Sequence, residues 1–323
     1  MLKNIPGLVL LALAGILFLT RNLSANEEKH KVGILLYSEQ ASYQNAFKGL
    51  LEQMKFQGFG EEKVEFEIRN AQGKKDSVIE ATKEFKAKGL DLIIVFGTPA
   101  IIVVAKEIKD TPVVFSMVFD PIGAGIVNFW ESSGNNLTGS STWISMVSLV
   151  NVLRKICPVK RLGVIYTGEE KQTVSQLREL QKLERRMKFT VVPANLTKVE
   201  DAGEVVNQLA LPTVDSIFIT GGTVVGDSLK QILEVAEIAR IPTAAHLMER
   251  AEDGVLLAVA ANSFSLGRLA GQKASEVLRG IKPEYIPIEY LEQYDIGINM
   301  KTARRIKMDM PDTFLKIATK VIE

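Results

Sequence analysis

The sequence contains a single cysteine and only two histidines among its 323 residues, and this scarcity limits the chemistry open to it. One cysteine, Cys157, cannot form an intramolecular disulfide, so disulfides do not hold this fold together. Cys157, His30 and His246 lie far apart in the sequence and are too few to build the usual zinc sites. We therefore expect no bound metal and no chemistry carried by a thiol.

An excess of one charge sign is also missing, because 39 Lys and Arg residues stand against 38 Asp and Glu residues. A protein that binds nucleic acid through phosphate contacts needs a basic surplus or a concentrated basic patch, and neither is visible. We expect no nucleic-acid partner. The remaining composition, with 46% apolar residues, is that of an ordinary globular protein, long enough for two domains that each bury a core.

The motifs of nucleotide-binding proteins and hydrolases are incomplete. Gly221-x4-Gly226 is followed by Asp227 where a phosphate-binding loop has Lys, and a carboxylate there repels phosphate. Gly123-Ala124-Gly125 lacks the third Gly of a dinucleotide-binding fingerprint, because residue 128 is Asn. No Gly-x-Ser-x-Gly elbow is present for a serine nucleophile. We therefore expect no cofactor and no catalytic residue.

The first 25 residues have the features of a targeting segment. Lys3 precedes 13 uncharged residues from position 7 to position 19, and Leu23-Ser24-Ala25 precedes a charged stretch. A membrane-spanning helix needs about 20 apolar residues, so residues 1–25 fit a secretory signal peptide better. An uncleaved anchor through residues 7–19 is the alternative, because the cleavage signal is imperfect. In both cases we expect export to the periplasm or another extracytoplasmic compartment.

From residue 31 onward, short β-rich runs alternate with amphipathic segments of helix length. Runs such as residues 31–37 (KVGILLY) and 91–96 (DLIIVF) are continuously apolar, as expected of parallel strands that are covered on both faces. Helical segments such as residues 41–57 and 172–187 lie between these runs. The alternation predicts an α/β fold with doubly wound parallel sheets.

A weak internal repeat indicates two lobes of similar topology. Three strand openings of the first half return in the same order in the second half. The matched segments are residues 31–35 with 161–165, 91–98 with 215–223, and 111–115 with 241–245. In sheets of this kind, ligands meet the carboxyl ends of the strands and the N-termini of the following helices. Two lobes that face each other would therefore hold a ligand in one shared cleft.

One long motif resembles a known protein family. Asp120-Pro121-Ile122-Gly123-Ala124-Gly125-Ile126-Val127, followed by Gly134-Asn135-Asn136-Leu137-Thr138-Gly139, is similar to the signature of ABC-transporter substrate-binding proteins of the tryptophan/tyrosine-binding-like type. Leu266-Gly267-Arg268-x-x-Gly271 and Ile298-Asn299-Met300-Lys301-x-Ala303 are similar to later segments of that family. The resemblance covers residues 31 to 311.

The resemblance implies a type I periplasmic-binding-protein fold, in which two α/β lobes are joined by a three-strand hinge and close on a ligand. We expect lobe 1 to comprise residues 28–140 and 262–292, and lobe 2 to comprise residues 141–261 and 293–323. The crossovers are expected near residues 138–142, 260–263 and 291–295.

The function implied by the resemblance is that of an exported solute-binding protein of an ABC importer. It would capture a small polar molecule, with an amino acid as one hypothesis, and deliver it to a membrane permease. It would be a monomer without enzymatic activity. Two alternatives are a ligand-sensing module for a signalling receptor and an enzyme on the same scaffold, with Glu169 and His246 as acid and base. A signalling domain would favour the first, and turnover of bound ligand the second.

The residues expected to contact the ligand lie in loops at the carboxyl ends of the predicted strands. Thr98 and Pro99, which open a predicted helix with Thr98 as its cap, are expected to hold an anionic group of the ligand. Glu169 is expected to hold a cationic group, with Asp120 and Glu249 as alternatives. The other expected contacts are Ser38, Gln40, Tyr43, Phe119, Tyr166, Gly222, Thr223 and His246.

The sequence departs from the amino-acid-binding members of the family in two loops. The first reads Tyr166-Thr167-Gly168-Glu169-Glu170-Lys171-Gln172-Thr173 and lacks an Asn-Ser pair, and the second reads Gly221-Gly222 in place of Asp-Asn. An α-amino acid needs a carboxylate for its ammonium group and donors for its own carboxylate. A differently charged or larger ligand therefore stays open beside an amino acid.

Overall fold

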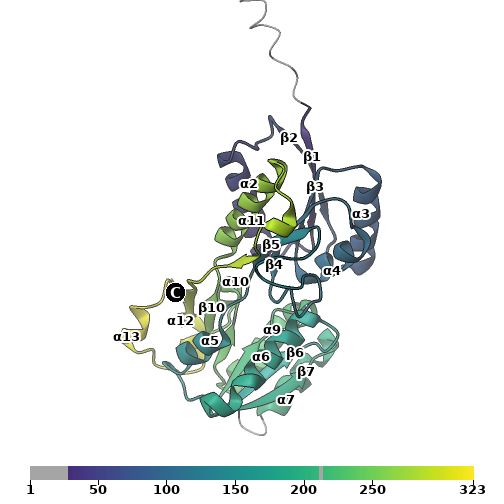
Figure 1. Ribbon diagram of the computed structural model, residues 1–323. Coiled ribbons are helices and arrows are strands. Elements are labelled where there is room, and N and C mark those ends of the chain that lie inside the picture. The colour runs from purple at the N-terminus through teal and green to yellow at the C-terminus, as the bar shows by residue number, and fades with distance from the viewer. Residues whose placement is uncertain (1–27, 211–213) are drawn as a thin grey trace, which may run out of the picture.

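Two α/β lobes make up the part of the chain that the computed structural model describes, residues 28–210 and 214–323 (Figure 1). The expected targeting segment, residues 1–25, lies outside these ranges. Within them, no helix combines the length and the hydrophobicity that a bilayer crossing requires.

The first lobe is built on a six-stranded sheet of order β11-β5-β4-β3-β1-β2, in which every paired strand runs parallel to its neighbour. Its strands are β1 (His30–Leu36), β2 (Val64–Asn70), β3 (Leu92–Phe96), β4 (Val113–Val118), β5 (Leu137–Ser141) and β11 (Glu289–Tyr290). Its helical segments are α2 (Ala41–Phe56), α3 (Lys75–Ala87), α4 (Thr98–Glu107), α11 (Ser263–Leu278) and η2 (Pro283–Tyr285).

The second lobe is built on a seven-stranded sheet of order β13-β12-β10-β9-β8-β6-β7, parallel except where β12 pairs with β10. Its strands are β6 (Arg161–Tyr166), β7 (Thr190–Asn195), β8 (Ser216–Ile219), β9 (Thr243–Ala245), β10 (Leu257–Ala260), β12 (Asp295–Asn299) and β13 (Lys320–Ile322). Its helical segments are α5 (Met146–Leu153), α6 (Lys171–Met187), η1 (Val199–Asp201), α7 (Ala202–Ala210), α8 (Thr223–Asp227), α9 (Leu229–Ile238), α10 (Met248–Glu252), α12 (Met300–Arg305) and α13 (Asp312–Leu315).

The two sheets repeat one topology, which confirms the predicted fold class. The order β2-β1-β3-β4-β5 of the first lobe corresponds to β7-β6-β8-β9-β10 of the second. Asp91 and Asp215, which open two of the matched segments, have the same structural role in both lobes. Asp91 accepts a hydrogen bond from the backbone N–H of Lys31 at 2.8 Å, and Asp215 accepts one from that of Arg161 at 2.6 Å. Each carboxylate ties the start of its strand to the start of the neighbouring strand.

The chain passes between the lobes three times. The connections are residues 142–145 between β5 and α5, residues 261–262 between β10 and α11, and residues 291–294 between β11 and β12. Figure 1 shows these segments between the upper and lower lobes. Strand pairing places Ser141 beside Tyr290 and Ala260 beside Asp295, so the connections lie next to one another and the lobes can turn about them as hinged bodies.

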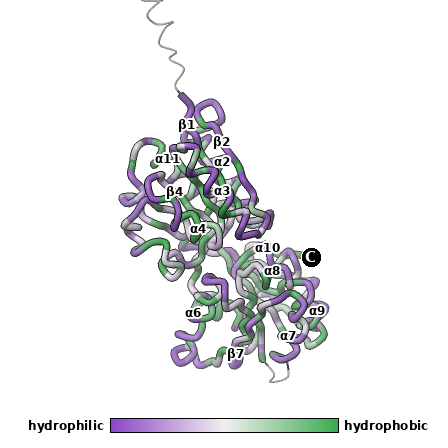
Figure 2. The backbone as a smooth tube through the Cα atoms, turned by 90° about the vertical axis from the view of Figure 1, so that its right-hand side faces the viewer, coloured by the Kyte–Doolittle hydropathy of each residue, from purple (hydrophilic) through white to green (hydrophobic). Residues whose placement is uncertain are grey.

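Apolar side chains fill the layers on both faces of each sheet. All five residues of β3 and all six of β4 are buried, as continuously apolar parallel strands require. Figure 2 shows hydrophilic residues along the outer helices and loops, with the hydrophobic ones between them. Cys157 lies in this core, and burial raises the pKa of its thiol to about 12. The thiol is therefore uncharged at neutral pH.

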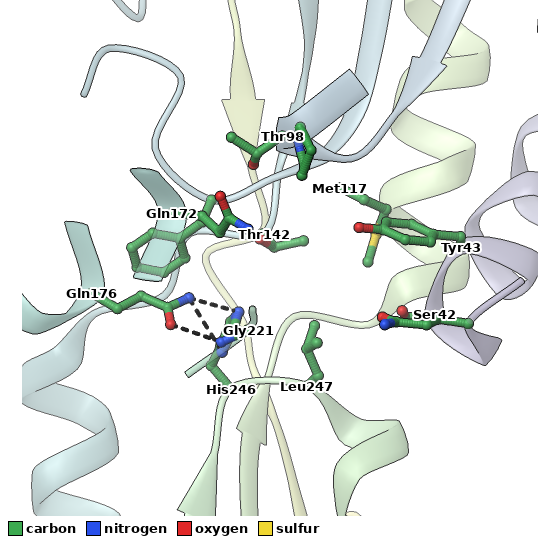
Figure 3. Close-up of a pocket in the computed structure, with 13 residues that line it drawn as sticks. Ser42, Tyr43, Thr98, Met117, Thr142, Gln172, Gln176, Gly221, His246 and Leu247 are labelled. Carbon is green, nitrogen blue, oxygen red and sulfur yellow. Dashed lines mark hydrogen bonds between the residues drawn. The ribbon is translucent and has the colours of Figure 1, made fainter. Parts of the chain in front are cut away.

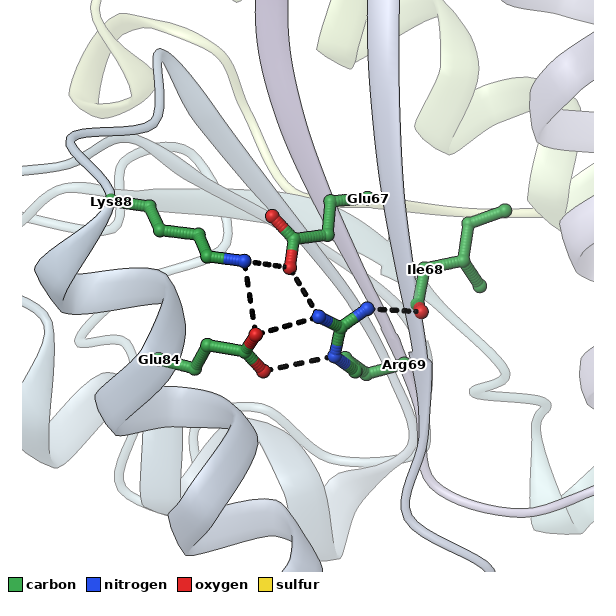
Figure 4. A network of polar contacts seen from close by, with 5 residues as sticks. All are labelled: Glu67, Ile68, Arg69, Glu84 and Lys88. Atoms are coloured by element: carbon green, nitrogen blue, oxygen red, sulfur yellow. Dashed lines mark hydrogen bonds and ion pairs between the residues drawn. The ribbon is translucent and has the colours of Figure 1, made fainter.

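The outer edge of the first sheet carries a network of four charged side chains (Figure 4). Arg69 on β2 donates from Nε and Nη2 to the two carboxylate oxygens of Glu84 at 2.9 and 2.6 Å, and Lys88 donates to Glu84 at 2.9 Å. Both cations also bond Glu67. These hydrogen bonds hold the pKa of Glu84 at about 2. Charged side chains along an edge strand also disfavour pairing with another chain.

Glycines allow α2 and α11 to pack closely. A Cβ at Gly267 would lie 1.8 Å from the carbonyl oxygen of Ala46, and a Cβ at Gly49 would lie 2.1 Å from that of Phe264. Real Cβ atoms do not approach backbone oxygens so closely. The Leu266-Gly267-Arg268-x-x-Gly271 motif therefore has a packing role, because the helices cross where no side chain fits.

We expect Gly267→Ala to lower the free energy of unfolding by about 1–3 kcal/mol, because the added methyl group forces the two backbones apart. Gly203→Ala is the matched control: Gly203 is also helical, in α7, and a Cβ there has no neighbour within 4 Å. Since Ala favours helix over Gly, the control should be neutral or stabilising. Urea denaturation of both variants measures the difference, and equal stability would contradict the packing role.

Candidate functional site

A pocket lies between the lobes, where strand-end loops of both sheets face each other (Figure 3). Its lining residues are Gln40, Ser42, Tyr43, Thr98, Pro99, Met117, Phe119, Thr142, Gln172, Gln176, Gly221, His246 and Leu247. They enclose about 400 Å³ of space, counting the part open to solvent, but a water-sized sphere fits in only about 30 Å³ of it. In this arrangement the pocket is a narrow slot.

The start of α4 forms one wall of the pocket. The residue that caps this helix is Gly97, with a φ of +102°, and a Cβ there would lie 2.8 Å from the hydroxyl oxygen of Tyr43. Thr98 is therefore the first helical residue and not the cap that the sequence predicted. Its side chain lines the pocket instead of capping its own helix. Since Thr98 and Pro99 both line the pocket, the positive end of the helix dipole lies at this wall.

An irregularity in β4 supplies another part of the same lobe's wall. The register between β4 and β5 shifts between Phe115 and Val118, and Met117 has a left-handed φ of +60°. A bulge of this kind re-aims a side chain at the end of a strand. Figure 3 shows Met117 directed into the pocket beside Tyr43. Phe119 follows at the strand end and packs edge-on against His246, with ring centroids 5.4 Å apart.

The second lobe contributes a buried pair, Gln176 and His246. The side-chain nitrogen of Gln176 lies 2.9 Å from Nε2 of His246, and its carbonyl oxygen accepts the backbone N–H of Gly221 at 3.0 Å. Burial first, and the positive charge of Arg250 second, lower the pKa of His246 to about 3. The imidazole is therefore neutral at physiological pH and serves as a hydrogen-bonding wall.

The side chains packed against residues 221 and 222 account for the glycines at these positions. A Cβ at Gly221 would lie 2.4 Å from Cε1 of His246, and a Cβ at Gly222 would lie 2.7 Å from a methyl carbon of Thr173. The imidazole thus occupies the space in which a side chain at position 221 would project. Glycine at positions 221 and 222 therefore leaves room for the side chains of His246 and Thr173.

Glu170, and not the neighbouring Glu169, is the carboxylate next to the pocket. Its oxygens accept the backbone N–H groups of Thr223 at 2.9 Å and Val224 at 3.2 Å, and it also accepts the side-chain amide of Gln172. A carboxylate at the start of α8 satisfies amides that have no partner within the helix. Gln172, a lining residue, is held in place by this contact.

Six of the expected contact residues line the pocket: Gln40, Tyr43, Thr98, Pro99, Phe119 and His246. The other seven do not: Ser38, Asp120, Tyr166, Glu169, Gly222, Thr223 and Glu249. Glu169 is exposed to solvent, whereas the Thr223 amide is already bonded to Glu170. Glu249 bonds Asn45 and lines a different cavity.

Seven lining residues were not expected: Ser42, Met117, Thr142, Gln172, Gln176, Gly221 and Leu247. Ser42 and Gly221 are next in sequence to the expected residues Tyr43 and Gly222. Gln172 and Gln176 are one helical turn apart at the start of α6, so they share a face. Their spacing of four residues is the feature of the sequence that could have predicted them as lining residues.

Hydrogen bonds link the two lobes around the pocket. Asp120 of the first lobe accepts the hydroxyl hydrogen of Ser175 on α6, and Lys171 donates to the carbonyl oxygen of Ala124 at 2.9 Å. Asp120, an expected ligand contact, is thus used between the lobes. The described arrangement is one in which the lobes touch.

The described lining residues include no Asp, Glu, Lys or Arg, so the pocket carries no ionised side chain of its own. A largely buried cation, Arg250, acts electrostatically on the lining residues Tyr43 and His246; its side chain is 12% exposed and lies 3.6 Å from the carboxylate of Asp253. Burial lowers the pKa of Arg250. The polar groups that the pocket presents are therefore mainly hydroxyls and amides, between rings and aliphatic groups.

Comparisons with known proteins agree on one family. Residues 31–322 match the family described as ABC transporter substrate binding protein. A relative from Clostridioides difficile (strain R20291), named tyrosine-binding protein, is 25% identical over 321 residues, which cover 95% of this chain and 93% of the relative.

Solved structures show the same similarity. An ABC domain from Streptococcus pneumonia in complex with L-Trp has a TM-score of 0.86 at 25% identity, covering 91% of this chain and 100% of that chain. A ligand-free, open substrate-binding protein from Clostridium difficile has a TM-score of 0.74 at 24% identity, covering 91% and 99%. Overall, the described structure is thus more similar to the L-Trp complex than to the open, ligand-free protein.

The pKa of His246 predicts a pH-dependent stability. Below pH 6.5 the unfolded chain binds a proton at this residue that the folded chain excludes until about pH 3, so stability falls as the pH is lowered through this window. His246→Gln should remove this part of the dependence, up to about 1.4 kcal/mol per pH unit. Urea denaturation from pH 7 to 4 measures the free energy of unfolding of both proteins. The contributions of the carboxylates that both proteins share cancel when one free energy is subtracted from the other. A difference that is independent of pH would contradict the neutral, buried imidazole.

Proposed function

The chain belongs to the family of ABC transporter substrate-binding proteins, and on this basis we propose that it captures an aromatic α-amino acid outside the cytoplasm and delivers it to a membrane permease. Members of this family bind solutes and do not transform them, so the chain is not an enzyme. The acid–base pair considered for an enzyme is not formed, because Glu169 is exposed and His246 is buried against Gln176.

The observation that carries the choice of ligand is the neutrality of the pocket. A singly charged solute would enter a slot with no opposite charge among its lining residues, and a desolvated, unpaired charge is costly. An α-amino acid with an uncharged side chain is a zwitterion with no net charge. Hydroxyls and amides can bond both of its ends without leaving a net charge buried.

The lining residues suggest how each part of such a ligand is held. The ligand carboxylate would face the hydroxyl of Thr98 and the positive end of α4. Its ammonium group would face the side-chain oxygen of Gln172, which Glu170 holds in position. Its ring would lie among Tyr43, Met117 and Phe119, since aromatic rings and thioethers pack favourably on one another.

Two comparisons support this choice from outside the chain. The relative from Clostridioides difficile is named a tyrosine-binding protein, and the Streptococcus structure contains L-Trp. Both similarities extend over nearly the whole described chain, so they include both walls of the pocket.

The narrow slot has a consequence for transport. An amino acid does not fit in about 30 Å³, so the lobes must separate about the three connections to admit it. Closure then places both lobes on the ligand and presents the closed outer surface to the permease. The ligand shifts the population toward the closed form only by its higher affinity for that form. Residues 1–25 would direct export, as a signal peptide or an anchor.

The test is a thermal-shift panel on the purified full-length chain after bound ligand has been removed by unfolding and refolding. L-Trp, L-Tyr and L-Phe should each raise the midpoint, because a ligand at 100 times its dissociation constant adds about 2.7 kcal/mol of stability. L-Lys, L-Glu and ribose should not. Recovery of the ligand unchanged would support binding without turnover. Stabilisation by the charged amino acids alone would contradict the neutral pocket.

Thr98→Val should weaken binding of the stabilising amino acid by about 5- to 150-fold, corresponding to about 1–3 kcal/mol for an unpaired polar partner. The variant keeps the shape of the side chain, so the ligand-free protein should unfold as before. Glu169→Gln is the control, because Glu169 is exposed outside the pocket. Isothermal titration calorimetry measures both affinities, and equal affinities would remove Thr98 from the site.

A further inference from the structure

A second cavity lies beside the crossovers and shares no lining residue with the pocket between the strand ends. On the measure that gives about 30 Å³ for the pocket between the strand ends, its volume is about 350 Å³. The lining residues are Asn45, Met248, Glu249, Glu252, Asn262, Ser263, Phe264, Asp295, Thr319 and Lys320. We refer to it as the hinge pocket, because residues 261–262 and 291–294 connect the lobes at this place.

Two buried polar atoms of the hinge pocket have no hydrogen-bond partner among the described residues. They are Oε2 of Glu249, a residue that is 9% exposed, and the hydroxyl oxygen of Ser263, which is 5% exposed. Leaving a buried polar atom unpaired costs about 1–3 kcal/mol, and more for a charged one. Both residues line one cavity, so a donor that enters it from outside the chain can pair with these atoms once the groups that cover them shift.

The charges around the hinge pocket favour a cation. Three carboxylates line it, those of Glu249, Glu252 and Asp295, against the single ammonium group of Lys320. Lys320 is paired with Glu252. The other two carboxylates receive amide hydrogen bonds, from Asn45 at 3.2 Å and from Asn262 at 3.1 Å, and the guanidinium of Arg250 acts on Glu249 electrostatically without a hydrogen bond. Neither amide neutralises a charge.

The N-terminus of α11 lies at this cavity, but it does not turn the negative charge of the lining into a positive one. The side-chain oxygen of Asn262 accepts the backbone N–H of Ser265 at 2.9 Å, so the helix is capped from within the chain. The net charge of the lining side chains is negative. An anionic occupant would therefore meet repulsion from Glu249 and Asp295.

We propose that the hinge pocket binds a small organic ammonium compound. An ammonium group carries three donors and suits acceptors that are spread around it, such as Oε2 of Glu249 and the hydroxyl of Ser263. A divalent metal requires several oxygen ligands converging on one point, and no group of three or more acidic, His or Cys side chains in the described ranges is arranged for that. Met248 and Phe264 supply apolar surface for the carbon chain.

Occupancy of the hinge pocket is coupled to the movement of the lobes. Asn45 and Phe264 belong to helices of the first lobe, whereas Glu249 and Asp295 belong to the second. The hydrogen bond from Asn45 to Glu249 joins α2 to α10 across the lobes. A ligand held between these groups has different affinities for the open and closed forms. If it changes the affinity of the other pocket for its ligand by some factor, that ligand changes the affinity of the hinge pocket by the same factor.

The experiment is calorimetric titration of the full-length chain with putrescine, with butane-1,4-diol as the uncharged compound of matched length. Putrescine should bind saturably with one molecule per chain, and the diol should not bind. Glu249→Gln should weaken putrescine binding at least tenfold, and Ser263→Ala should weaken it by a smaller factor. Glu200→Gln removes the same charge from an exposed position and should leave binding unchanged.

Several results would overturn the proposal. They are no saturable putrescine binding at millimolar concentration, equal binding of the diol, and unchanged affinity in both Glu249→Gln and Ser263→Ala. Thr98→Val separates the two pockets, because it alters the pocket between the strand ends and leaves the hinge pocket intact. Loss of putrescine binding in Thr98→Val, with retention in Glu249→Gln, would assign the amine to the other pocket. Ser263→Ala tests the site independently if Glu249→Gln fails to fold.

Discussion

The parallel strands of both sheets are covered on both faces, and the rest of the architecture depends on this constraint. Helices and apolar side chains fill the layers above and below each sheet, so polar loops can gather only at the strand ends. Two lobes with the same strand order and three connecting segments bring the carboxyl ends together. The pocket, its helix terminus and its hinge all arise from this arrangement.

Within the pocket, the chemistry is set by exclusion of charge. The carboxylates near it are engaged elsewhere: Glu170 holds the start of α8, and Asp120 bonds Ser175 between the lobes. Burial keeps His246 neutral. What faces the slot is a set of hydroxyls, amides and apolar groups, which suits a zwitterion. Glu249, whose Oε2 atom has no hydrogen-bond partner among the described residues, lines a separate cavity whose net negative charge favours a cation.

The described conformation combines contact between the lobes with a slot too narrow for an amino acid. Both features follow from side chains that meet across the cleft, such as Phe119 against His246. A binding protein of this kind works by the free-energy difference between open and closed forms. Groups at the hinge can change that difference without touching the ligand, which gives the cavity beside the crossovers its functional interest.

The sequence by itself determined the fold class, the repeated lobes and the family. These depend on local periodicity, on repeated strand openings and on the long motif that begins at Asp120, all of which are properties of contiguous residues. It also indicated the loops that line the pocket, and within them Tyr43, Thr98 and His246. Only the tertiary structure decided which side chains of those loops face inward. Glu169 and Glu170 are adjacent, and the turn before α6 exposes one and directs the other to the backbone amides at the start of α8. Met117 is directed into the pocket by a shift in strand register. Gly221 leaves space for the imidazole of His246, which is 25 residues distant in sequence. Side-chain direction in a strand-end loop depends on packing between distant segments, and local pattern does not contain that information.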